Sequence, residues 1–245
     1  MMNSIKSLSA KTLVCLPTYN EARNLYEITN AVFRALPGVS ILVIDDNSPD
    51  KTGMMAEQMA RNNPQLSVLH RSRKEGLGRA YLDGFRHAFL SRHDVRRIVQ
   101  MDADLSHPPE LLPHMLDMSR KADLVIGSRY VAGGRTRNWG IHRRMISRFG
   151  SLYARAWLGI PVCDLTGGFK VWHRELLEQI LTYSIDSGGY VFQAETTFLA
   201  HRLGACVREV PILFTDRYAG KSKMSAAIAF EACWHLPSIR WKKRL

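Results

Sequence analysis

Residues 97–104 read RIVQMDAD, a short apolar run that ends in two carboxylates. Residues 97–101 have the composition of a buried strand, and the chain turns polar at Asp102. Before it, strand-like runs at residues 12–16, 39–44 and 66–70 alternate with helical spacing at residues 21–36, 52–61 and 78–91. Strands that alternate with helices of this length predict an α/β fold with a Rossmann-like, mostly parallel sheet flanked by helices.

The second half of the chain has a looser pattern. We expect strands at residues 122–127, 206–211 and 212–214, helices at residues 143–158, 174–181 and 194–203, and a Gly/Arg-rich loop at residues 133–138. No linker is long enough to divide the chain, so residues 1–223 are predicted to form one domain. Residues 224–245 are predicted to form an amphipathic basic tail.

The composition is that of a globular protein with a basic charge. Of the 245 residues, 46% are hydrophobic and 23% are charged, which argues against disorder. The 34 Lys and Arg residues outnumber the 22 Asp and Glu residues and give a net charge of +12. Such a charge favours nucleic acid, anionic lipid or a phosphorylated small molecule as a partner. A solvated basic surface is the alternative.

Cysteine spacing and hydropathy indicate the compartment. The four cysteines form no CxxC pair, which argues against a structural zinc site or a redox motif. The N-terminus lacks a signal-peptide pattern, and no window approaches the ~18 consecutive apolar residues of a membrane span. We therefore expect a reducing, cytoplasmic location.

Polar clusters follow three of the predicted strands. They are residues 17–21 (PTYNE), 45–50 (DDNSPD) and 102–107 (DADLSH). In open α/β sheets the ligand crevice lies at the carboxyl ends of the strands, so we expect these clusters to meet there. Within them, Asp50 and Asn20 are also candidates to cap the helices that follow, and Tyr19 is a candidate to pack on a base.

Asp102 and Asp104 suit a hard cation. Mg²⁺ usually takes one or two protein carboxylates and completes its shell with water and phosphate oxygens. A metal bound to a diphosphate stabilises the charge that builds on a leaving nucleotide. The alternative is a solvated turn or a helix start, which Pro108, Pro109 and Glu110 would suit.

Six motifs together resemble the inverting family 2 glycosyltransferases. They are PTYNE, DDNSPD, GLGRAYLDGF, MDADLSHPP, GSRYVAGG and TGGFK, in the expected order within residues 12–223. Within that family the sequence is most similar to the dolichol- or polyprenol-phosphate mannosyltransferases. The resemblance implies a GT-A catalytic domain, GDP-mannose as donor and a polyprenyl (dolichyl-type) monophosphate as acceptor.

The resemblance also implies roles for particular residues. The nucleotide of the donor would contact Pro17, Tyr19, Glu21, Asp46 and Asp102. Asp104, with Asp102, would hold Mg²⁺ or Mn²⁺. Several relatives carry Gln two residues after the second Asp as a further metal ligand, whereas this chain has Ser106.

Further roles by resemblance concern the acceptor and the donor sugar. Arg129, Arg143 and Ser147 match positions that receive the acceptor phosphate, and Arg forks suit phosphate oxygens. Exposed or structural arginines are the alternative. The remaining matches are Arg217 and Lys223 in a loop that closes over the diphosphate, and Gln193 and Glu195 near the donor sugar. A charge in the first turn of a helix is the alternative for Glu195.

The expected mechanism needs no general base. A lipid monophosphate has a second pKa of about 6, so it is already a nucleophile at neutral pH. We therefore expect in-line attack on the anomeric carbon with inversion. Asp102 and Asp104 act through the metal, while Arg129 and Arg143 place the acceptor.

A lipid acceptor requires contact with a membrane surface. Residues 240–244, beside Trp234 and Trp241, have the composition of a peripheral interfacial helix, at the cytoplasmic face. Alternatively, this segment is an ordinary packing helix, or a partner protein anchors the chain at the membrane. Rival functions are transfer from UDP-glucose or another donor, transfer to a glycan, and nucleotide-sugar binding without turnover. Nucleic-acid binding is disfavoured, because the acidic clusters repel phosphates and no nucleic-acid module is present.

Overall fold

The computed structural model describes residues 2–216, 236–237 and 239–241. Arg217, Lys223 and Trp234, for which the sequence predicts roles, lie outside the described residues. None of the helices in the described part of the chain combines the length and the apolar character that crossing a bilayer requires.

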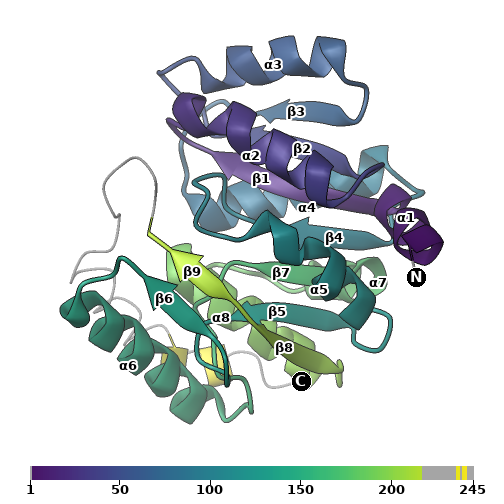
Figure 1. Cartoon of the computed structure of the whole chain (residues 1–245). Coiled ribbons are helices and arrows are strands. Elements are labelled where there is room, and N and C mark those ends of the chain that lie inside the picture. Colours follow the sequence, from purple (N-terminus) through teal and green to yellow (C-terminus); the bar gives the residue numbers. More distant parts are fainter. Residues whose placement is uncertain (1, 217–235, 238, 242–245) are drawn as a thin grey trace.

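The centre of the fold is a seven-stranded sheet in the order β3-β2-β1-β4-β7-β5-β8 (Figure 1). Six of its strands are parallel, and β7 runs antiparallel to both of its neighbours, β4 and β5. The strands are β1 (Thr12–Thr18), β2 (Ser40–Asp45), β3 (Leu66–His70), β4 (Arg97–Gln100), β5 (Leu124–Ser128), β7 (Lys170–His173) and β8 (Val207–Pro211). The predicted mostly parallel sheet is confirmed.

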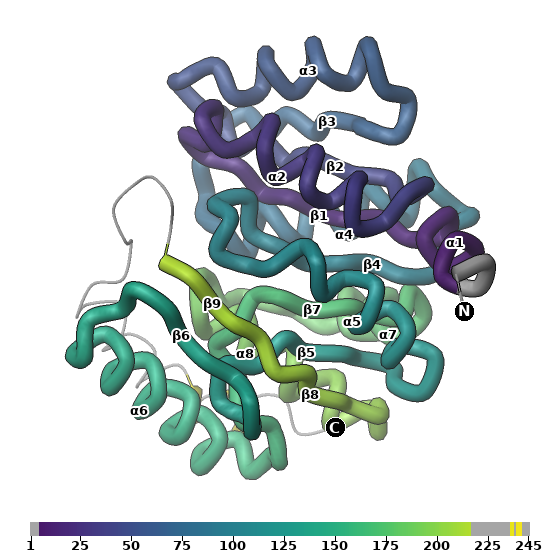
Figure 2. The backbone as a smooth tube through the Cα atoms, in the orientation of Figure 1, coloured from purple at the N-terminus to yellow at the C-terminus, as the bar shows by residue number. Residues whose placement is uncertain are grey.

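A second, two-stranded parallel sheet pairs β6 (Arg135–Arg137) with β9 (Leu213–Thr215). The predicted loop at residues 133–138 therefore contains a short strand. Figure 2 shows the path of the chain: the first half builds the β3–β4 side of the sheet, and the second half builds the side from β7 to β8.

Helices cover both faces of the large sheet (Figure 1). Side chains of α4, α7 and α8 share one apolar core, and those of α2, α3 and α5 share the other. The helices are α1 (Met2–Ala10), α2 (Ala22–Ala35), α3 (Thr52–Asn62), α4 (Leu77–Ser91), α5 (Leu112–Met118), α6 (Ile141–Leu158), α7 (Arg174–Ile180) and α8 (Gly189–Arg202).

The continuous apolar strands explain why both faces are covered. Successive side chains of a strand point to opposite faces. In β1, Leu13 and Cys15 enter the core on the α4 side, whereas Val14 and Leu16 enter the core on the α2 side. A strand that is apolar at every position must be buried on both faces, as in other parallel sheets.

Strand β7 was not predicted, because a lysine lies within its four residues. Lys170 is fully buried, and its Nζ donates to the carbonyl oxygen of Gln193 (2.8 Å) and to Oγ1 of Thr197 (2.9 Å). Both acceptors belong to α8, so the lysine fastens this helix to the sheet. Helix α8 also starts earlier than the sequence predicts, at Gly189.

The described part of the predicted tail packs on the fold. Leu236 and Ile239 are buried in the core on the α4 side. Nη1 of Arg240 donates to the carbonyl oxygen of Trp157 at the end of α6 (2.9 Å). Membrane contact by the tail stays a prediction.

We expect Gly134→Ala to destabilise the fold. A Cβ at Gly134 would lie 2.6 Å from the carbonyl oxygen of Ser128 and 2.7 Å from the carbonyl carbon of Arg129. Because both contacts are backbone atoms, the start of β6 must move, and the free energy of unfolding should fall by about 1–3 kcal/mol. Gly140→Ala is the control, since its Cβ would meet nothing within 4 Å. Equal urea midpoints for the two variants would contradict the close packing.

Candidate functional site

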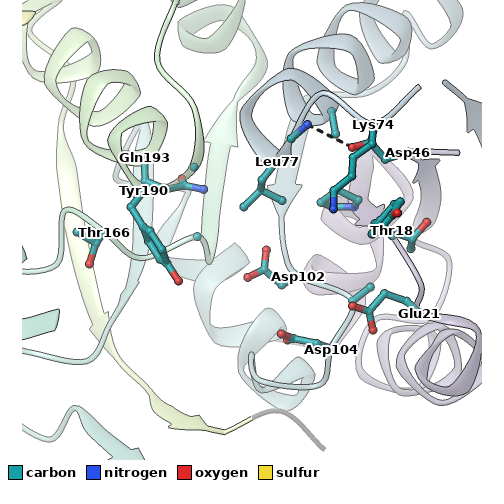
Figure 3. A pocket seen from close by; sticks show the side chains of 17 residues that line it. Thr18, Glu21, Asp46, Lys74, Leu77, Asp102, Asp104, Thr166, Tyr190 and Gln193 are labelled. Atoms are coloured by element: carbon teal, nitrogen blue, oxygen red, sulfur yellow. Dashed lines mark hydrogen bonds between the residues drawn. The ribbon is translucent and has the colours of Figure 1, made fainter. Parts of the chain in front are cut away.

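A pocket lies at the carboxyl ends of β1, β2 and β4 (Figure 3). Asp102 and Asp104 lie between two groups of side chains: Thr166, Tyr190 and Gln193 on one side, and Glu21, Asp46 and Lys74 on the other. The predicted site residues that line the pocket are Pro17, Tyr19, Glu21, Asp46, Asp102, Asp104 and Gln193. The three strand-end clusters therefore meet, as the sequence predicts.

Hydrogen bonds hold the first two clusters against each other. Asp50 accepts from the backbone N–H of Ala22 (3.1 Å) and of Thr52 (3.0 Å), the first residues of α2 and α3. The residue that precedes α3 is Lys51, so the prediction that Asp50 is its N-cap is wrong in position, although the Asp50 carboxylate still accepts from the first N–H of the helix. Asn20 is not a cap: it has a φ of 61°, and its backbone N–H donates to Oγ of Ser48 (3.1 Å). The residue that precedes α2 is Glu21.

The pocket carboxylate of Asp46 is paired with Arg71, a residue that the sequence did not single out. Both side chains are nearly buried, and Nη1 of Arg71 donates to Oδ1 of Asp46. Arg71 also forms ion pairs with Glu75 (2.7 Å) and Asp83 (2.8 Å). Burial alone lowers the pKa of Arg71, but Asp83 and Asp46 outweigh it and raise the pKa, so the arginine stays charged. Asp46 is therefore held in place by a fixed positive charge.

The carboxylates of Asp102 and Asp104 are oriented by buried groups. The hydroxyl of Tyr81 donates to Oδ1 of Asp102 (3.1 Å). Burial, and then the charge of Asp102, raise the pKa of Tyr81 well above its usual value, so the phenol keeps its proton. The backbone N–H of Ser106 donates to Oδ1 of Asp104 (3.1 Å).

His107 fixes the backbone at Asp102. Its Nδ1 accepts from the backbone N–H of Asp102 (3.0 Å), and its ring stacks on Phe169 with centroids 5.1 Å apart. Burial lowers the pKa of His107 despite the nearby carboxylates. A neutral ring with Nδ1 as acceptor carries its proton on Nε2.

The acid pair fits a divalent cation that is shared with a ligand. Two carboxylates in one pocket are the protein donors that Mg²⁺ or Mn²⁺ takes when water and phosphate oxygens supply the rest. Within the described residues, no cluster of three or more His, Cys, Asp or Glu offers a complete protein cage. Ser106 is not among the residues that line the pocket, and its hydroxyl is buried.

A buried relay sets the direction of the Gln193 amide. An indole N–H can only donate, and Nε1 of Trp172 donates to Oε1 of Gln100 (3.2 Å). The amide nitrogen of Gln100 must then face Gln193, and it donates to Oε1 of Gln193 (2.6 Å). Nε2 of Gln193, buried and facing the pocket, has no partner in the described part of the chain. The relay therefore presents a hydrogen-bond donor beside Asp102.

Glu195 does not line the pocket. It is buried and accepts from the hydroxyl and the backbone N–H of Ser187. Since α8 begins at Gly189, Glu195 lies in the second turn, and the alternative of a first-turn charge is wrong.

Arg129 lies behind the pocket wall. Its Nε and Nη2 donate to both carboxylate oxygens of Asp164 (2.7 and 2.6 Å), and Nη2 also donates to Oγ1 of Thr166 (2.8 Å). Burial alone raises the pKa of Asp164, but Arg129 outweighs it and lowers the pKa, so the pair is ionic. Thr166 lines the pocket, so the pair positions part of its wall. Direct phosphate contact by Arg129 stays a prediction.

Arg143 and Ser147 lie on α6, outside the lining of the pocket. Nη1 of Arg143 donates to Oδ1 of Asp216 (2.7 Å), and its guanidinium lies 4.2 Å from the centroid of the Trp139 ring. Oγ of Ser147 accepts from the hydroxyl of Tyr130 (2.7 Å). The phosphate roles of Arg143 and Ser147 also stay predictions.

Several lining residues were not predicted from the sequence, notably Lys74, Thr166 and Tyr190. The ammonium of Lys74 lies 3.7 Å from the centroid of the Tyr19 ring, which gives the pocket a cation. Lys74 and Arg71 follow β3, so the strand-end rule that identified the other clusters could have identified this one as well.

The chain belongs to the family described as glycosyl transferase family 2, whose model matches residues 13–181. It is therefore a glycosyltransferase with a GT-A fold. Among curated relatives, undecaprenyl-phosphate mannosyltransferase of Micrococcus luteus is 45% identical over 95% of this chain and 96% of its own. Polyprenol monophosphomannose synthase of Mycolicibacterium smegmatis is 47% identical over 96% of this chain and 89% of its own.

Solved structures share the fold at low identity. Glucosyl-3-phosphoglycerate synthase from Mycobacterium tuberculosis, with Mn²⁺, UDP-glucose and glycerol 3-phosphate, has a TM-score of 0.68 and 17% identity, covering 99% of this chain and 83% of that one. A mannosyltransferase from Pyrobaculum calidifontis, with GDP-Man and Mn²⁺, has a TM-score of 0.61 and 18% identity, covering 94% and 69%.

We expect Gln100→Leu to lower turnover although Gln100 does not line the pocket. Without the relay, the amide of Gln193 is free to flip, and one oriented hydrogen bond is worth about 1 kcal/mol, or roughly fivefold in rate. Exposed Gln58 on α3 provides the control, Gln58→Leu. Turnover is measured well below the melting temperature of each variant, and equal rates would exclude the relay.

Lys170 should make stability depend on pH. Burial lowers its pKa from 10.5 to about 7, against the opposing charge of Asp164. Between these two values the unfolded chain binds more protons than the folded chain, so the contribution of Lys170 to stability rises with pH and is lost as pH falls through 7. The free energy of unfolding of wild type minus that of Lys170→Met should therefore increase above pH 7. The hydrogen bonds lost in the variant give an offset, and a difference that stays constant with pH would refute the prediction.

Proposed function

We propose that this glycosyltransferase moves mannose from GDP-mannose to a polyprenyl-type monophosphate and inverts the anomeric centre. The pocket that joins Asp102 and Asp104 to the strand-end loops carries this proposal. Two relatives at 45% and 47% identity, whose names state polyprenyl-phosphate mannosyl transfer, support it over nearly the whole chain.

The nucleotide diphosphate is assigned to the side of the pocket that faces β2. Tyr19 offers an aromatic face, Asp46 and Glu21 offer acceptors for donor hydroxyls, and Lys74 offers a cation for phosphate oxygens. Pro17 belongs to the same wall. This arrangement accounts for why acidic and basic groups share one pocket.

Asp102 and Asp104 would hold Mg²⁺ or Mn²⁺. The bound ion would neutralise the charge that develops on the departing diphosphate. Tyr81, His107 and the backbone N–H of Ser106 keep the two carboxylates in position before the ligand arrives. Nε2 of Gln193, which is buried on the other side of the pocket (Figure 3), would donate to the donor sugar.

The acceptor phosphate acts as nucleophile without a general base, because it is largely ionised at neutral pH. One of its oxygens forms a bond to the anomeric carbon, and the bond from that carbon to the diphosphate oxygen breaks. GDP leaves with the electron pair. Three residues, Arg129, Arg143 and Ser147, are assigned to placing the phosphate. Arg217 and Lys223 are assigned to covering the diphosphate. We place the protein at the cytoplasmic face of a membrane, directly or through an anchoring partner.

Asp104→Ala should abolish transfer while leaving the fold intact. Loss of a metal-binding carboxylate removes several kcal/mol of transition-state stabilisation, so turnover should fall by about a hundredfold or more. The assay incubates protein, Mn²⁺, a short polyprenyl phosphate and radiolabelled GDP-mannose, and then counts label in the organic phase. Asp94→Ala, at a carboxylate that is 57% exposed, should retain activity.

Parallel reactions with UDP-glucose and with EDTA test the donor and the metal. If only UDP-glucose gives labelled lipid, the donor is UDP-glucose and not GDP-mannose. Wild-type activity in Asp104→Ala would reject the metal site. If no donor gives labelled lipid, the proposal of a lipid acceptor is rejected, whereas membership of the family is unaffected.

A further inference from the structure

Helix α6 exposes an unusual number of large apolar side chains. Six of them are between 41% and 71% exposed: Ile141, Met145, Ile146, Phe149, Leu152 and Trp157. Ile141, Met145, Phe149 and Leu152 follow at intervals of four, four and three residues, which places them in one stripe along the helix. We call these six side chains the α6 stripe.

The buried face of α6 is made mainly of small residues. Ser147, Ser151 and Ala154 face the protein, together with Leu158 at the end of the helix. A surface helix normally turns its large apolar residues toward its own core. In α6 the large apolar residues instead point away from the core, so the α6 stripe is suited to an apolar environment outside the fold.

Arginines run beside the α6 stripe. Arg144, Arg148 and Arg155 are exposed and are spaced by four and seven residues, which puts them on a second line along the helix. Large apolar side chains bordered by arginines are the composition of a helix that lies in the interface of an anionic bilayer. A protein partner would not require a row of cations along one border.

The buried face of α6 is connected to the pocket. Oγ of Ser151 is hydrogen-bonded to Oγ1 of Thr166 (3.1 Å), and Thr166 lines the pocket. The helix thus has the pocket wall on one side and the α6 stripe on the other. An acceptor with its phosphate in the pocket and its hydrocarbon chain in a bilayer needs this arrangement.

We propose that α6 lies in the surface of an anionic membrane, with the α6 stripe among the lipid chains and the three arginines at the phosphate headgroups. The link to the acceptor rests on the proposed function, whereas membrane binding itself can be measured separately. The tail was the predicted contact. Of its described residues, Leu236 and Ile239 are buried in the core, whereas Trp241 is 69% exposed. The six exposed side chains of α6 offer a larger apolar contact than this one tryptophan.

Sedimentation of the full-length protein with vesicles tests the proposal. The vesicles are phosphatidylcholine alone, or phosphatidylcholine with phosphatidylglycerol. The double variant Phe149→Ser/Leu152→Ser should bind the mixed vesicles about tenfold more weakly or worse, because two large apolar side chains no longer enter the bilayer. Leu90→Ser is the matched control: Leu90 is 80% exposed on α4, and its loss should leave binding unchanged.

A second variant tests the arginines. Arg144→Glu/Arg148→Glu should lose the preference for vesicles that contain phosphatidylglycerol, and salt should weaken wild-type binding in the same way. Because all four substituted side chains are exposed, thermal melting of both variants should match wild type.

Three outcomes would overturn the proposal. They are equal sedimentation of wild type and both variants, no sedimentation of wild type, and a wild-type dimer that Phe149→Ser/Leu152→Ser converts to monomer. The last would assign the α6 stripe to a second copy of the chain. With a short, water-soluble acceptor phosphate, Phe149→Ser/Leu152→Ser should keep wild-type turnover. If wild type itself gives no product, the proposed function fails, while the sedimentation result still decides the role of α6.

Discussion

The structure depends on one buried amine. Lys170 lies in the antiparallel strand β7 and donates two hydrogen bonds to α8, so it joins the sheet to the helix that brings Gly189, Tyr190 and Gln193 to the pocket. A buried ammonium is unfavourable without partners, and the two acceptors reduce that penalty. Asp164, which attracts the amine, is itself held by Arg129. The buried Lys170 and the ion pair of Asp164 with Arg129 thus support the same wall of the pocket.

The other wall is built differently. Loops after β1, β2 and β3 are joined by short polar contacts, in which Asp50 and Thr52 connect the starts of two helices and Arg71 holds Asp46. The wall on the α8 side is positioned by buried side chains of the sheet and α8, and the wall on the β2 side by contacts between loops, among them the buried pair of Arg71 and Asp46. Between them, the two aspartates follow the strand β4, which is central to the sheet. Binding residues on loops that a rigid scaffold positions are a common arrangement.

Local sequence predicted the parts of the fold that depend on local pattern. Strands β1 to β4 and helices α2 to α4 follow from apolar periodicity, and the acid pair follows from its position after β4. Strand β7 could not be found in this way, because Lys170 interrupts its short apolar run and is satisfied only by α8. Nor does sequence alone show that Arg129 pairs with Asp164, 35 residues away, rather than with a ligand. Lys74 was within reach of the strand-end rule but was not recognised.

The relay from Trp172 to Gln193 has an evolutionary consequence. The indole of Trp172 in the core determines that Gln193 presents a hydrogen-bond donor to the pocket. Two residues, Gln100 and Gln193, link this indole to the pocket. A homologue with identical lining residues but phenylalanine at position 172 would leave both amides free to reverse, and Gln193 could then present an acceptor to the pocket. The hydrogen-bond character of the pocket can therefore change through a substitution in the interior while the lining residues stay constant, and an alignment restricted to the lining residues would not reveal that change.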